Sequence, residues 1–324
     1  MLGLVLAAAL QTGGWALPAS RPCTDAEIRE LTRPSDTPFR LACRAELNGA
    51  TVTRRVLIEG AEASGAGLDC GGGSIGRPGE RTTTQTPTIA VWSRRLEGPT
   101  PRWSKPTDIA IRRCTVHGAV RIWGMGVGGR IDDLRASSRT AGHSRAARDA
   151  APSHVTLDTV TFAATGSIPL YVGPGVTRTK VTGSRFTGRS DATAVYLDAE
   201  SRQTEIIDVT FDVRTGREII AIDGSAANLV TASRFALNGR GGVFLYRNCG
   251  EDGVIRHQTP SDNVVADNIF SGAGWLNPRL VVVGAREGGR TYCSDDRGWP
   301  FGSSVDDGDH AERNVVYRNR RLAR

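Results

Sequence analysis

The stretch Thr159-Val-Thr-Phe162 returns along the chain as Gly183-Ser-Arg-Phe186, Asp208-Val-Thr-Phe211, Ala232-Ser-Arg-Phe235 and Asp267-Asn-Ile-Phe270. The phenylalanines are 24, 25, 24 and 35 residues apart. Ile109–Cys114 and Ile131–Ala136 show a similar pattern, with Cys114 and Ala136 in the place of the phenylalanine. A period of this length indicates a small supersecondary unit that buries its apolar face by stacking on its neighbours.

A second short apolar strand follows each of these positions, for example Leu170–Val172, Val195–Asp198, Ile220–Asp223 and Val243–Tyr246. Gly, Asn, Asp and Ser separate the strands and leave no room for a helix of ordinary length. We therefore predict an all-β solenoid with coils of about 22–25 residues. A β-sandwich is the structural alternative, but a constant spacing of one pattern does not favour it.

Two further stretches look like known β-helix coils. Val56-Leu-Ile-Glu-Gly60 with Ser64–Gly72 looks like a first full coil, and Asn263–Gly272 looks like a repeat unit that Asn314–Asn319 echoes. Over about residues 55–320 the chain thus resembles the pectin-lyase-like superfamily of right-handed, single-stranded parallel β-helices. The resemblance implies this fold for residues 55–324. It leaves the chemistry open, since the superfamily includes lyases, hydrolases, epimerases, tailspikes and adhesins.

The ends of the chain and its cysteines bear on location. Residues 1–20 are apolar and then rich in small residues, which predicts a secretory signal, although no Lys or Arg precedes the apolar run. A buried first strand or helix is the alternative. The six cysteines lack paired C-x-x-C spacing, so we expect disulfides rather than a zinc site, in a secreted or periplasmic protein. A Cys23–Cys43 bond would fix an N-terminal cap at 21–54, whereas the pairing of Cys70 and Cys114 stays open.

Composition limits the partners. The 324 residues carry a net charge of +7, which favours an acidic polysaccharide. Nucleic acid is not expected, because the arginines are dispersed and no aromatic-interleaved basic patch is present in the sequence. No apolar run is long enough to span a bilayer. We expect a monomer.

The outward positions of the second strand predict a binding face, because side chains alternate along a strand. They include Trp123, Tyr171, Tyr196 and Phe244, which we expect to bind sugar rings. Asp198 and Asp223 are 25 residues apart and should lie on neighbouring coils. Such a pair suits acid/base chemistry on a glycosidic bond. It would equally suit a cation, so calcium stays open, or cap turns structurally.

Two long loops, 247–262 and 285–313, leave the same corner of the solenoid, and a Cys249–Cys293 disulfide would join them. The first contains Arg247, Arg256 and His257. Arg256, with His257 or Tyr246 as base, would supply the cation and the proton acceptor that uronate chemistry needs. The alternative is that the arginine and glutamate side chains of this loop pair with each other and only stabilise its conformation. Residues 135–148 are interpreted as an exposed loop that forms part of a groove wall.

We therefore expect an extracytoplasmic lyase or glycoside hydrolase that acts on an acidic polysaccharide, with no cofactor other than the open case of calcium. The expected catalytic residues are Asp198, Asp223, Arg256, His257 and Tyr246, and the expected substrate-binding residues are Tyr171, Tyr196, Trp123, Arg247 and Phe244. A non-catalytic carbohydrate-binding or surface structural β-helix and a uronate epimerase are the alternatives.

Overall fold

The structure, a computed structural model, describes residues 20–272, 278–287 and 295–322. The predicted signal segment, apart from Ser20, and Cys293 lie outside the described residues. Within the described part, no helix has the length and the apolar character needed to cross a membrane.

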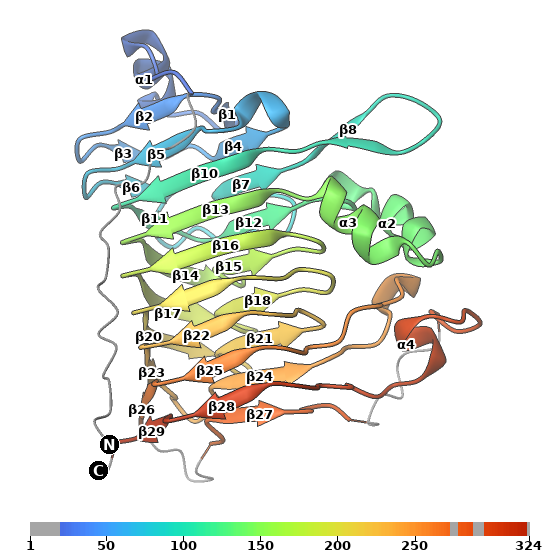
Figure 1. Ribbon diagram of the computed structural model, residues 1–324. Coiled ribbons are helices and arrows are strands. Elements are labelled where there is room, and N and C mark those ends of the chain that lie inside the picture. Colours follow the sequence, from blue (N-terminus) through green and yellow to red (C-terminus); the bar gives the residue numbers. More distant parts are fainter. Residues whose placement is uncertain (1–19, 273–277, 288–294, 323–324) are drawn as a thin grey trace, which may run out of the picture.

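Three parallel sheets of nine strands each form the solenoid (Figure 1), and each coil contributes one strand to each sheet. The first sheet contains β1 (Phe39–Arg40), β4 (Val56–Glu59), β7 (Ile89–Trp92), β12 (Val120–Trp123), β15 (Leu170–Val172), β18 (Val195–Leu197), β21 (Ile220–Asp223), β24 (Val243–Tyr246) and β27 (Val281–Val283). The second contains β2 (Arg44–Glu46), β5 (Gly67–Asp69), β10 (Thr107–Arg112), β13 (Ser153–Asp158), β16 (Thr177–Thr182), β19 (Glu205–Ile207), β22 (Leu229–Thr231), β25 (Val264–Ala266) and β28 (Val315–Tyr317).

The third sheet contains β3 (Thr51–Val52), β6 (Ser74–Ile75), β11 (Thr115–His117), β14 (Thr161–Gly166), β17 (Arg185–Ser190), β20 (Thr210–Thr215), β23 (Arg234–Ala236), β26 (Ile269–Ser271) and β29 (Arg320–Arg321). This topology confirms the predicted right-handed parallel β-helix. A separate antiparallel hairpin, β8 (Arg94–Leu96) and β9 (Arg102–Ser104), projects from one side of the solenoid (Figure 1).

The repeated phenylalanines form the predicted column inside the solenoid. Phe162, Phe186, Phe211, Phe235 and Phe270 are fully buried, and successive rings stack with centroids 4.3 to 4.8 Å apart. The column continues with Val116, which pairs with Phe162, and not with Cys114. The placement of Cys114 in the phenylalanine position was therefore wrong by two residues.

A helical insertion interrupts the repeat between β12 and β13. Residues 131–136 are not a coil, because helix α2 covers Ile131–Ser138 and helix α3 covers His143–Ala150. The predictions of a coil there, of a loop at 135–148 and of no ordinary helix were wrong. The physical reason is amphipathic spacing: the buried residues Leu134 and Ser138, and then His143, Ala147 and Ala150, recur every three or four positions.

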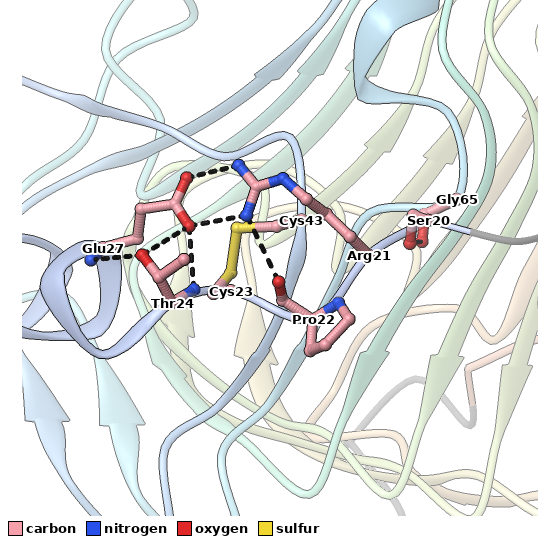
Figure 2. Close-up of a disulfide and its surroundings, with 8 residues drawn as sticks. All are labelled: Ser20, Arg21, Pro22, Cys23, Thr24, Glu27, Cys43 and Gly65. Atoms are coloured by element: carbon pink, nitrogen blue, oxygen red, sulfur yellow. Dashed lines mark hydrogen bonds and ion pairs between the residues drawn. A yellow bond between two sulfur atoms is a disulfide. The ribbon is translucent and has the colours of Figure 1, made fainter.

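The N-terminal end of the solenoid is covered as predicted. Helix α1 (Asp25–Thr32) begins with a capping box between Thr24 and Glu27, and its Leu31 packs into the core. Figure 2 shows the Cys23–Cys43 disulfide beside this cap, which confirms that pairing. Cys70 bonds to Cys114, a pairing that the sequence left open. The remaining short helices are η1 (Ala61–Ala63), η2 (Val127–Gly129), η3 (Glu251–Gly253) and α4 (Gly302–Val305).

Candidate functional site

A cleft of about 400 Å³ lies on the outer face of the first sheet. Its floor comes from β12, β15 and β18, and its walls come from the helical insertion and from the loop after β24. The lining residues on the floor are Arg121, Trp123, Tyr171, Tyr196 and Asp198, and those on the walls include Ile131, Leu134, His143, Asn248, Glu251, Val254, Ile255 and Arg256. The predicted groove wall at 135–148 is thus helical and supplies His143.

Three aromatic side chains line the floor of the cleft. The Trp123 and Tyr171 rings are 5.7 Å apart in an edge-on arrangement, and the Tyr171 and Tyr196 rings stack at 5.9 Å. They lie together because Tyr171 and Tyr196 occupy the same outward position on paired strands. Phe244 belongs to the same column but is not among the lining residues, since Ala221 stands between it and Tyr196.

The two predicted aspartates hold one arginine between them. Arg256 Nη1 lies 2.6 Å from Asp198 Oδ1 and 3.1 Å from Asp223 Oδ2. Asp198 and Arg256 line the cleft, whereas Asp223 is fully buried and is not among the lining residues. The guanidinium therefore lies where a cation shared by the two carboxylates would have to lie.

Tyrosine and backbone donors complete the pairing of both carboxylates. Tyr171 donates its hydroxyl hydrogen to Asp198, and Tyr196 donates to Asp223. The Ala199 N–H donates to Asp198 Oδ1 at 2.8 Å, and the Asn248 N–H donates to Asp223 Oδ1 at 2.7 Å. These contacts hold the carboxylates in place and occupy much of their capacity to accept hydrogen bonds.

The pKa shifts follow from burial and from these contacts. Burial raises the pKa of Asp223, although Arg256 opposes that shift. Burial also raises the pKa of Tyr171 and Tyr196 well above the usual tyrosine value, so both stay protonated. Burial lowers the pKa of Arg256, but the Asp223 and Asp198 carboxylates outweigh it and raise that pKa well above the ordinary value. Arg256 is thus a paired cation and not a base.

Three other predicted site residues are directed elsewhere. His257 Nε2 lies 2.6 Å from the Ser138 carbonyl oxygen, so this ring joins the loop to the end of α2. The Tyr246 hydroxyl donates to Glu218 at 2.9 Å, and Arg247 pairs with Asp306. None of the three is among the residues that line the described cleft.

The two long loops do pack together. The Gly250 N–H donates to Asp296 Oδ2 at 3.1 Å, and the Arg256 N–H donates to Ser303 Oγ at 3.0 Å. Cys249 is buried, and its predicted partner Cys293 lies outside the described residues. The Cys249–Cys293 pairing therefore stays a prediction.

Several cleft residues were not among the predicted site residues, and two of them, Arg121 and His143, bear on the chemistry. Arg121 occupies an outward position of β12, in register with Tyr171, as strand alternation predicts, but it was not chosen as a site residue. His143 could not be identified, because the sequence reading missed α3. Its Nδ1 lies 3.0 Å from Ser137 Oγ, and burial lowers its pKa to about 4, so the ring is neutral at neutral pH.

The group of side chains that has distances suitable for a metal ion lies outside the cleft. Among the described residues, one group with suitable distances is Cys23, Glu27 and Cys43, and its two sulfur atoms are bonded to each other (Figure 2). No family model and no curated protein matches this chain.

Proposed function

We propose that this protein acts outside the cytoplasm, as a monomer, and cleaves an acidic polysaccharide by β-elimination in the cleft. The observation that supports this most is the floor of Trp123, Tyr171 and Tyr196 beneath walls that carry titratable groups. Aromatic rings of this kind pack against the apolar faces of sugars. The two disulfides fit an oxidising compartment.

The reaction assigns roles to residues of the cleft. In β-elimination the carbon beside the carboxylate loses its proton, the neighbouring glycosidic C–O bond breaks, a C=C bond forms, and the leaving oxygen takes a proton. His143 lines the cleft with a neutral ring and is the proton acceptor in this proposal, a weak base because burial lowers its pKa to about 4. Tyr171, which burial keeps protonated, is the proton donor.

Hydrolysis by the two aspartates has less support. A hydrolase needs two carboxyl groups on opposite sides of one glycosidic bond, and Asp223 is fully buried beneath Arg256. Non-catalytic binding of an acidic polysaccharide is the second candidate. The hydrogen bonds and ion pairs of Asp198 and Asp223 favour it, because carboxylates held in this way stabilise a surface without needing to react.

The experiment incubates the purified protein with uronate-containing and neutral polysaccharides. Ultraviolet absorbance detects unsaturated products, and a reducing-end assay detects all cleavage. We expect new absorbance with an acidic polysaccharide, lost in His143→Asn and in Tyr171→Phe. Reducing ends without absorbance, lost in Asp198→Asn, would make the protein a hydrolase. Inverted uronate units without cleavage would make it an epimerase, and binding without any product would favour the second candidate.

A further inference from the structure

Arg121 is a buried cation that forms no ion pair with any of the described residues. Only 3% of the residue is exposed, yet it lines the cleft. Its Nε has no hydrogen-bond acceptor among the described residues. Burying a charge without a partner costs several kcal/mol. Natural proteins retain such a cost mainly where it serves a function.

The other arginines near the cleft differ from Arg121. Arg256 lies between two carboxylates, and Arg217 pairs with Glu218 at 2.9 Å. Their positive charge is therefore compensated by the protein itself. Among the described arginines that line the cleft, Arg121 is thus the cation left for a ligand, whereas the sequence had predicted that role for Arg256.

Aromatic rings hold the Arg121 guanidinium in place. It lies over the Tyr171 ring, with Cζ 4.9 Å from the ring centroid, and Trp123 follows two residues later on the same strand. The indole Nε1 of Trp123 is also buried, with no acceptor in the described part of the chain. Two donors that have no acceptor among the described residues thus belong to one strand, two positions apart.

We propose that Arg121 binds the anionic group of one sugar unit, a uronate carboxylate or a sulfate ester, and thereby fixes the register of the chain in the cleft. This inference rests on the proposed function. A guanidinium binds such groups through two parallel N–H···O bonds, so the contact selects both charge and orientation. Burial lowers the pKa of Arg121 when the cleft is empty, and a bound anion would relieve that penalty.

The test measures binding by titration calorimetry with three probes. They are a uronate oligosaccharide, the same oligosaccharide with its carboxyl groups reduced to alcohols, and a neutral oligosaccharide carrying sulfate esters. The variants are Arg121→Gln and Arg121→Lys. Arg29→Gln is the matched control, since it removes the same charge at an exposed position of α1, away from the cleft.

We expect Arg121→Gln to weaken binding of the matching acidic probe about 10- to 100-fold, the range for a hydrogen bond to a charged group. Arg121→Lys should restore part of the affinity, and Arg29→Gln should leave it unchanged. Loss with the uronate probe alone identifies a carboxylate, and loss with the sulfated probe alone identifies a sulfate ester. The reduced probe should bind wild type and Arg121→Gln equally.

A stability measurement separates binding from folding. Because Arg121→Gln removes an unpaired buried charge, its melting temperature should equal or exceed that of the wild type. Acidic-probe binding that is the same in wild type and Arg121→Gln overturns the inference and leaves the proposed function standing. A wild type that binds none of the three probes overturns both.

Discussion

His143 should make the protein less stable as the pH falls below about 6.5. Its pKa is about 4 in the folded protein, against about 6.5 in an unfolded chain. A folded-state pKa below the unfolded value means that the unfolded chain takes up the proton first. The stability that neutral His143 contributes is therefore complete above about pH 6.5 and is lost as the pH falls to about 4, by about 3 kcal/mol in total.

The surroundings of the ring account for this shift. His143 is 1% exposed, and burial is the largest cause of the low pKa. The Glu200 carboxylate opposes the shift, whereas His257, whose ring centroid is 5.1 Å away, and Arg148 reinforce it. Protonation would place a charge where the described structure provides one carboxylate, and Glu200 already accepts hydrogen bonds from Ser144 and from the backbone of His257.

The assay compares urea unfolding midpoints of wild type and His143→Asn at several pH values from about 7 to about 4. The asparagine side chain keeps a polar atom near the position of His143 Nδ1, where it can still hydrogen-bond to Ser137, but it does not titrate. The other titrating groups are shared, so their contribution cancels in the difference between the two proteins. We expect the wild-type midpoint to fall further on acidification. Parallel pH profiles for the two proteins would refute the reasoning.

The remaining predictions concern the free energy of unfolding, measured by urea titration with circular dichroism. Phe211→Ala should cost about 3–5 kcal/mol, because it opens a cavity between Phe186 and Phe235, while Phe211→Leu should cost much less. Replacing Cys70 and Cys114 together by serine should cost about 4 kcal/mol, the entropy of a loop of 44 residues, and a cost near zero would contradict this. Asp223→Asn should cost about 3 kcal/mol by unpairing part of Arg256, whereas Asp212→Asn, at an exposed ion pair, should cost under about 1 kcal/mol.

The fold was predictable where the core column consists of phenylalanines. One residue type recurs there from Phe162 to Phe270, so the length of each coil can be read from the sequence. It was not predictable at Cys114, because the turn that sets the register has no common residue type. In the six coils from Val116 to Phe270, the residue three positions before the column adopts a left-handed conformation, and it is Arg113, Thr159, Gly183, Asp208, Ala232 or Asp267. Glycine and aspartate are common at such a position and therefore indicate a turn, whereas arginine, threonine and alanine do not. The coil containing Arg113 was therefore read two residues out of register.

The site was predictable to the extent that strand alternation governs it. Trp123, Tyr171 and Tyr196 lie on outward positions of the first sheet, Asp198 directly follows β18, and all four line the cleft. Alternation says nothing about contacts across coils, so it could not show that Arg256 would neutralise Asp198 and Asp223. It also failed for His143, because a helix inserted into a solenoid follows a period of 3.6 and not the period of the coils.

The position of the cleft follows from two interruptions of the repeat. The helical insertion leaves after β12, and the first long loop leaves after β24, while the coils of β15, β18 and β21 between them turn within a few residues. The two longer segments meet above these short turns: the Ile255 N–H donates to Ser138 Oγ at 3.0 Å, and Arg135 donates to the Asp252 carbonyl oxygen. The Gln258 side chain ties the loop to the turns below through the carbonyl oxygens of Ser201 and Gly224. A cleft forms over β15 and β18 because their own coils are too short to fill it, so the regular coils supply the aromatic floor and the irregular segments enclose it.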